Sequence, residues 1–219
     1  MREKRNVLTY LAEKEWLIMS LWFGLSFIGA FMEVSRNNFN NYRIFKDVFF
    51  HVIHQQPLYI PYPADYYDVN LYGPLFSLVI APFAGLEIHL GAMLWSLTGS
   101  AVLFYAIRQL PLLRMQQNII LLLCSMELMG ASSWFQMNQF IGAFIILTFA
   151  NTVKGKELWA AFFIVLGTLT KFLWYRRTCI LLLYPQSQTV YRLPVFMGRG
   201  HVCTTHDHIF SPIYYSMLL

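Results

Sequence analysis

The sequence predicts an all-α, polytopic integral membrane protein. Of its 219 residues, 57% are apolar and only 12% are charged, whereas about a quarter of the residues of a soluble domain are charged. Intrinsic disorder is excluded by the same composition, because disorder requires low hydrophobicity and high charge. The net charge of +5 accompanies 19 Phe, 13 Tyr and 6 Trp, which favours a membrane protein over a nucleic-acid-binding protein. Segments that cross lipid must be helical, since an unsatisfied backbone polar group is costly there.

The first predicted transmembrane helix covers residues 16–32, which carry no charge. A run of about 17 to 25 such residues crosses a bilayer core of roughly 30 Å. A cleaved signal peptide is the alternative. However, the 15 residues before the run are of mixed charge and longer than the short basic start of a signal peptide, and no small-residue cleavage site follows the run. Arg2, Lys4 and Arg5 precede the helix, so the positive-inside rule places the N-terminus in the cytoplasm.

Residues 72–172 are predicted to contain the further transmembrane helices, about six in total with the first. The apolar segments in this part of the chain are 69–86, 88–107, 115–126, 128–153 and 158–170. Strict alternation of these segments places Arg108 and Arg114 outside, which the positive-inside rule disfavours. Either one apolar segment is re-entrant, or these arginines bind a lipid phosphate.

Residues 33–71 form the predicted outer loop, which we expect to carry the active site. The apolar residues of one stretch recur at helical spacing and predict an amphipathic helix on the membrane surface; they are Phe45, Val48, Phe49, Val52 and Ile53. Asp65, Asp68 and Asn70 follow, among several tyrosines and prolines. So long a loop is functional or disordered, and its aromatic content argues against disorder. An interfacial aromatic belt is the alternative for most of its rings.

Five short motifs follow one another between residues 10 and 172. They are Arg36 with Asn38-Phe39-x-x-Tyr42, then Leu58-Tyr59, then Tyr72-Gly73-Pro74-Leu75-Phe76 with Ala81-Pro82-Phe83-Ala84, then Trp134-Phe135-Gln136-x-Asn138, and finally Gly167-Thr168-Leu169-Thr170-Lys171-Phe172. In this order and with these gaps, they resemble the motifs of glycosyltransferase family 87.

The resemblance implies a membrane glycosyltransferase with a GT-C-like N-terminal helix bundle in the inner (plasma) membrane. Such an enzyme transfers a hexose, typically mannose, from a polyprenyl phosphate to a lipid-linked or glycan acceptor on the outer side. The lipid-phosphate sugar is then a substrate, and no cofactor is implied. The expected partners are the lipid bilayer, this donor and the acceptor, without nucleic acid. A small polytopic transporter and a non-catalytic membrane subunit are the alternatives.

The resemblance also points to catalytic residues, with one departure from the family pattern. The family's Asp before Phe, its expected general base, is Asn38 here, and an amide cannot remove a proton. Asp68 is the first choice for the carboxylate because it lies four residues before Tyr72, and Asp65 and Glu33 are the other choices. We expect the substitution Asn38→Asp to be tolerated, since it is nearly isosteric in a hydrated loop.

Substrate binding is expected from cations, amides and tyrosines near the predicted site. These candidates are Arg36, Tyr42, Arg43, Tyr72, Gln136, Asn138 and Lys171. The arginines suit a lipid phosphate, with Arg108 as a further choice, and the amides suit sugar hydroxyls. Contacts with lipid headgroups are the alternative for the arginines and for Lys171. Glu127 interrupts an apolar run and is a functional candidate on that ground.

No metal site is predicted. His51 and His54 lie three residues apart without a third ligand, and the three cysteines show no metal-binding spacing. A histidine-rich stretch near the end would suit zinc, but it falls in residues 173–219, which we interpret as a frameshifted tail. Reading the codons of this tail one base later can yield apolar, membrane-like segments. We therefore expect a truncated chain with a poorly ordered tail, low stability and no catalytic turnover.

Overall fold

The computed structural model describes residues 12–171, and residues 1–11 and 172–219 lie outside the described part. Within residues 12–171 the chain is all-helical, with seven helices and no strand. The helices are α2 (Glu15–Ser35), α3 (Asn40–Ile53), α4 (Phe76–Ala84), α5 (Ile88–Arg108), α6 (Arg114–Ser133), α7 (Asn138–Val153) and α8 (Glu157–Thr170). The predicted all-α class is confirmed for this part of the chain.

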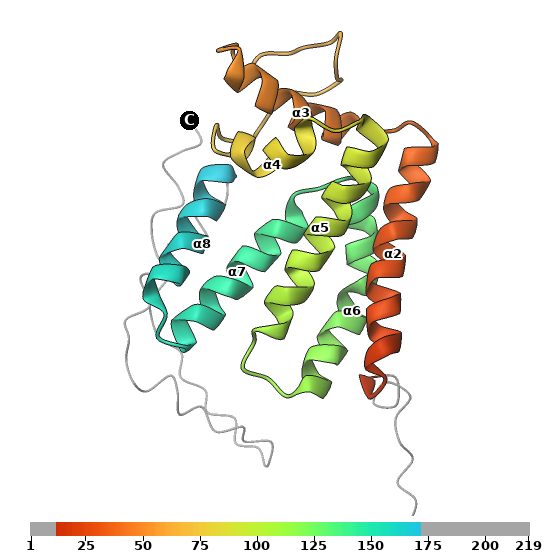
Figure 1. Ribbon diagram of the computed structural model, residues 1–219, viewed down its shortest axis with the longest axis vertical. Helices are drawn as coiled ribbons and strands as arrows, with labels where there is room; N and C mark the ends of the chain where they lie inside the picture. The colour runs from red at the N-terminus through yellow and green to blue at the C-terminus, as the bar shows by residue number, and fades with distance from the viewer. Residues whose placement is uncertain (1–11, 172–219) are drawn as a thin grey trace, which may run out of the picture. The chain divides into compact units, whose positions relative to one another are not determined.

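Five of these helices form an up-and-down bundle, and α3 and α4 pack against each other at one end of it (Figure 1). The helix α2 contacts α5 and α6, α5 also contacts α7, and α7 contacts α8. We call the end that carries α3 and α4 the loop end. The opposite end, where α2 begins and where the connections 109–113 and 154–156 lie, is called the basic end.

A network of buried hydroxyl groups joins the helices in the interior of the bundle. The Oγ of Ser26 in α2 hydrogen-bonds to the Oγ of Ser100 in α5 and, at 2.8 Å, to the Oγ of Ser132 in α6. The indole of Trp22 donates to the carbonyl of Ser100 at 3.0 Å, and Gln139 of α7 donates to Ser132 at 2.7 Å. Small residues allow the helix backbones to approach closely enough for these bonds.

The apolar segment 69–86 does not form the long helix that its composition predicts. Its only helix, α4, has nine residues and is about 14 Å long at 1.5 Å per residue, which is about half of a bilayer core. Pro82 lies inside α4 and cannot donate a backbone hydrogen bond. Since this segment does not run the length of the bundle, Arg108 and Arg114 lie at the basic end.

The predicted break at Glu127 is also absent. The helix α6 continues through this residue to Ser133, with Glu127 exposed, because a glutamate costs a helix little. The break lies at residues 134–137 instead, where Phe135 has a φ of +50°.

The predicted amphipathic helix is present as α3, but it starts earlier than its apolar stripe and is rotated about its axis. Phe45 and Val48 are buried as expected, whereas Ile53 is 56% exposed. Ile44 and His51 are buried in its place. The stripe is displaced because α3 packs against α4.

Two of the described helices, α2 and α5, are long and apolar enough to cross a membrane. The helices α7 and α8 are apolar but shorter, with 16 and 14 residues.

Candidate functional site

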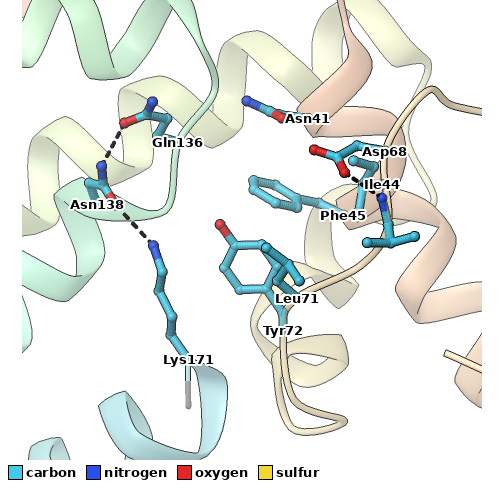
Figure 2. A pocket seen from close by; sticks show the side chains of 10 residues that line it. Asn41, Ile44, Phe45, Asp68, Leu71, Tyr72, Gln136, Asn138 and Lys171 are labelled. Carbon is cyan, nitrogen blue, oxygen red and sulfur yellow. Dashed lines mark hydrogen bonds between the residues drawn. The ribbon is translucent and has the colours of Figure 1, made fainter. Parts of the chain in front are cut away.

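A cavity of about 180 Å³ opens at the loop end of the bundle (Figure 2). It is lined by residues from α3, from the connection between α3 and α4, from the connection between α6 and α7, and from the ends of α7 and α8. The lining residues are Asn41, Ile44, Phe45, Asp68, Val69, Leu71, Tyr72, Gln136, Asn138 and Lys171. We call it the loop-end cavity. Five of the predicted site residues meet there: Asp68, Tyr72, Gln136, Asn138 and Lys171.

One side of the loop-end cavity is a chain of hydrogen bonds from a cation to two amides. The Nζ of Lys171 donates to the Oδ1 of Asn138 at 3.2 Å, and the Nδ2 of Asn138 donates to the Oε1 of Gln136 at 2.6 Å. The ammonium also lies 5.7 Å from the centre of the Tyr72 ring. Burial lowers the pKa of Lys171, since the charged form loses water. The cation therefore gains from an anionic partner in the cavity.

Asp68 lies on the other side of the cavity from this chain (Figure 2). Its Oδ1 accepts the backbone N–H of Val69 at 2.8 Å, and the residue is exposed. A carboxylate has about four acceptor positions, so this single bond leaves Asp68 able to accept a hydroxyl proton. The cavity thus combines a carboxylate, an ammonium and three amides.

Tyr72 points its hydroxyl into the cavity (Figure 2). Asn70 is 1% exposed and fixes the Tyr72 backbone, because its side chain both accepts from the N–H of Tyr72 at 2.9 Å and donates to the carbonyl at 3.0 Å. The ring packs edge-on against Phe45 at 4.9 Å between centroids. Burial raises the pKa of Tyr72 to about 12, so that at neutral pH the hydroxyl is protonated and able to donate.

The connection before α4 is fastened to the end of α8 next to Tyr72. The N–H of Gly73 donates to the carbonyl of Thr170 at 3.2 Å. A Cβ at Gly73 would collide with the carbonyl of Leu169. The absence of a side chain at this position therefore allows the contact that brings Tyr72 and Lys171 together.

Asn38 lies outside the loop-end cavity, in a second polar cluster at the same end. Its Nδ2 donates to the Oε2 of Glu33 at 2.8 Å, and Arg36 forms an ion pair with the Oε1 of Glu33 at 3.0 Å. Asn38 also lines a small neighbouring cavity of about 100 Å³. Asn41 lines both cavities and donates to the carbonyl of Trp134 at 2.9 Å.

The remaining predicted site residues lie elsewhere. Tyr42 is fully buried, its hydroxyl donates to the carbonyl of Phe83 at 3.0 Å, and burial raises its pKa to about 12; it has a packing role instead of the predicted contact with substrate. Asp65 and Arg43 are exposed and do not line the loop-end cavity. Arg108 lies at the basic end, paired with Glu15 at 3.4 Å.

No group of three metal-binding side chains occurs within residues 12–171. His51 is buried with its ring stacked on Tyr62 at 4.1 Å between centroids. The histidine-rich stretch with His201, Cys203, His206, Asp207 and His208, and the frameshift interpretation of residues 173–219, lie outside the described residues.

Four residues important to the site were missed from the sequence: Asn41, Phe45, Asn70 and Gly73. Asn41 lies one turn before Phe45 on α3. It was missed because the predicted apolar stripe begins only at Phe45, whereas α3 begins at Asn40. Phe45 was assigned to the apolar stripe, although it also faces the cavity. The roles of Asn70 and Gly73 depend on contacts that no local pattern indicates.

The sequence profile of glycosyltransferase family 87 matches residues 70–185, which are 116 of the 219 residues. The chain belongs to glycosyltransferase family 87. Within this family 87 chain, the match covers Tyr72, Gln136, Asn138 and Lys171 but begins two residues after Asp68. It ends at residue 185, whereas the motifs placed the end of the resemblance at residue 172. No curated protein and no solved structure matches the chain. Family membership and the two long apolar helices together indicate a membrane protein.

Proposed function

We propose that this family 87 chain is built to transfer a hexose, with mannose as the first choice, from a polyprenyl phosphate to a lipid-linked or glycan acceptor. The proposed reaction takes place in the loop-end cavity at the outer face of the inner (plasma) membrane. The observation that carries the proposal is the presence of a carboxylate and an ammonium across one polar cavity, with two of its amides and the ammonium inside the family match.

The residues have distinct roles in the proposed reaction. The Asp68 carboxylate accepts the proton of an acceptor hydroxyl as that oxygen bonds to the anomeric carbon of the sugar. The bond from the anomeric carbon to the phosphate oxygen breaks, and its electron pair leaves on the phosphate. Lys171 stabilises the resulting negative charge, while Gln136 and Asn138 hydrogen-bond to sugar hydroxyls. No nucleotide and no cofactor is needed for this step.

A small transporter, one of the two alternatives, makes different demands on the bundle. A transporter needs polar groups along the centre of the bundle to bind its cargo. The central hydroxyls of this chain, at Ser26, Ser100 and Ser132, already hydrogen-bond to one another. The loop-end cavity offers a ligand a carboxylate together with an ammonium, which a transferase can use for proton removal and for phosphate binding.

The test is a transfer assay with membranes that contain the full chain and a radiolabelled polyprenyl-phosphate mannose. Measurable transfer by the wild type would overturn the sequence-based expectation that residues 173–219 leave the chain without turnover. We expect Asp68→Asn to lower the rate at least a hundredfold, the usual contribution of a general base. The matched control Asp65→Asn removes a carboxylate that lies outside the cavity and should leave the rate within about twofold. The control Asp47→Ala should do the same.

The opposite pattern, with Asp65→Asn inactive and Asp68→Asn active, would overturn the assignment of the base. Binding is measured separately with a short-chain polyprenyl phosphate, and Lys171→Gln should weaken it about tenfold, the lower end of the range for one charge-assisted hydrogen bond. A chain that neither transfers mannose nor binds the polyprenyl phosphate would contradict the proposed function.

A further inference from the structure

A second cavity, of about 220 Å³, opens at the basic end between α5, α7 and α8. It is lined by Tyr105, Gln109, Leu147, Asn151, Lys154, Lys156, Trp159 and Phe163. We call it the basic-end cavity. Leu147 is buried and Phe163 half-buried, whereas both lysines are exposed. The cavity therefore has an apolar floor and a cationic rim, and none of the proposed transferase residues belongs to it.

The polar groups of this cavity suit an anion. Lys154 and Lys156 supply two ammonium groups, and no carboxylate occurs among the lining residues. The Nζ of Lys154 is held against the cavity by a hydrogen bond to the Oε1 of Gln109 at 2.8 Å. Glu157 lies beside the cavity, in an adjoining hollow that shares Lys156 and Trp159. Even when its charge is counted, the rim keeps a net positive charge.

The start of α8 adds to this preference. Lys156 is the N-cap residue of this 14-residue helix, and its side chain forms no capping hydrogen bond. The first N–H groups of a helix lack intrahelical partners and carry a partial positive charge, which attracts anions. The same residue that supplies an ammonium to the rim thus also leads into a first turn with backbone donors, although Glu157 in that turn offsets part of its positive charge.

Two features distinguish a lipid from a free anion. Trp159 and Tyr105, on the rim, are 58% and 57% exposed, as expected for amphipathic rings at the level of lipid headgroups. The outward face of α8 continues from the cavity as an apolar surface, with Leu158 88%, Phe162 50% and Val165 53% exposed. Acyl chains can lie along this surface while the headgroup occupies the cavity.

We propose that the basic-end cavity binds the phosphate of an anionic phospholipid headgroup. Lys154 and Lys156 contact the phosphate, the rings of Tyr105 and Trp159 border it, and the acyl chains cover the exposed face of α8. The proposal requires a membrane setting but is independent of sugar transfer.

The test counts the lipids that remain bound to the purified full chain, by native mass spectrometry after exchange into vesicles of stated composition. With phosphatidylglycerol in a phosphatidylcholine background, we expect one tightly retained phosphatidylglycerol per chain. The substitutions Lys154→Gln and Lys156→Gln should each weaken retention about fivefold, and about twenty-five-fold together, since each basic residue near an anionic surface contributes about that much. Lys14→Gln, which removes a charge at the same end but outside the cavity, should leave retention unchanged.

Three results would overturn the proposal. They are equal retention of phosphatidylcholine, unchanged retention in the double variant, and displacement of the lipid by inorganic phosphate at the concentration at which the lipid itself saturates. The last result would show that a free anion is the ligand. Circular dichroism checks that the double variant is folded. If it is not, Lys156→Gln alone decides, because this side chain is exposed and a fivefold loss remains measurable.

Discussion

The amide of Asn38 donates its hydrogen bond to a carboxylate of the same chain, Glu33, at 2.8 Å. The sequence resemblance implied an aspartate at this position, which lies outside the family match over residues 70–185, and the sequence predicted that Asn38→Asp would be tolerated. The structure adds a modest cost to this expectation, because the substitution replaces the donor with a second carboxylate beside Glu33. An amide suits this position because it donates a hydrogen bond to the Glu33 carboxylate, whereas an aspartate would repel it.

We predict that Asn38→Asp lowers the free energy of unfolding by roughly 0.5 to 1 kcal/mol at neutral pH, the size of a surface charge interaction. The two carboxylates repel each other at neutral pH, and salt screens this repulsion. Thermal unfolding of both proteins at neutral pH, at low and at high salt, measures it. Asn40→Asp is the control, since the Oδ1 of Asn40 accepts the N–H of Tyr67 at 2.9 Å and a carboxylate can do the same. Equal stability of the two variants at neutral pH would contradict the prediction.

A second prediction for a single residue concerns Glu87 and the dependence of stability on pH. Its carboxylate is hydrogen-bonded to the His89 side chain and accepts the N–H groups of His89 at 2.9 Å and of Leu90 at 3.0 Å. These bonds lower the pKa of Glu87 to about 2. Because the pKa is lower in the folded state, the stabilisation is present above the unfolded value of about 4.3 and is lost as the pH falls towards 2.

The matched variant is Glu87→Gln, which keeps the shape of the α5 N-cap but cannot ionise. We expect the melting temperature of the wild type to fall more steeply than that of the variant between pH 4.5 and pH 2.5. Parallel curves over this interval would show that the carboxylate contributes nothing through its ionisation.

At the scale of the elements, the contact between the α4 connection and the end of α8 holds the loop-end cavity together. We predict that Gly73→Ala destabilises the fold by about 1 to 3 kcal/mol, the usual cost of overpacking, because the new Cβ meets the Leu169 carbonyl. Chemical unfolding measures this cost. Gly85→Ala is the matched control, since nothing lies within 4 Å of the Cβ position at Gly85. A Gly73→Ala variant as stable as the Gly85→Ala control would contradict the role given to this contact.

The elements also show what the sequence could and could not predict. Charge-free runs identified α2 and α5 because hydrophobicity depends on composition alone. The same criterion failed for 69–86, where only the nine residues of α4 are helical and Pro82 removes one backbone hydrogen-bond donor. It also failed at Glu127, because one exposed charge interrupts a hydrophobic run without interrupting a helix.

For the site, motif spacing brought together Tyr72, Gln136, Asn138 and Lys171, and position in the loop added Asp68. The first four residues lie within the family motifs, and Asp68 lies only four residues before one of these motifs, so sequence position was enough to select them. Tyr42 was misplaced because its motif does not reveal which face of α3 packs inward. The two hydrogen bonds from the Asn70 side chain to the Tyr72 backbone were not predictable, since they depend on the fold of the connection between α3 and α4.

At the scale of the described chain, more of the basic residues at the ends of the bundle helices lie at the basic end than at the loop end, which has Arg36 and Lys171. Arg108, Arg114, Lys154 and Lys156 all lie at the basic end, together with the start of α2. In the proposed membrane orientation this end faces the cytoplasm, in agreement with the positive-inside rule.

This orientation can be tested by labelling. In a background free of native cysteines, a cysteine placed at position 65 should react with an impermeant maleimide in intact cells. Cysteines placed at positions 112 and 156, in the two connections of the basic end, should be protected until the membrane is permeabilised. Labelling at 112 and 156 with protection at 65 would reverse the topology, and labelling at all three positions would contradict a membrane-embedded bundle.

The buried serine network has a consequence for how the protein is made. Ser26 finds one partner 74 residues later, at Ser100, and another 106 residues later, at Ser132. At a synthesis rate of about 5 to 20 residues per second, the second partner follows Ser26 by roughly 5 to 20 seconds. During this interval α2 cannot complete its native hydrogen bonds. Release of α2 into lipid on its own would leave the Ser26 hydroxyl without these two partners. We therefore expect α2 to stay at the ribosome-bound insertion machinery until α6 has been synthesised.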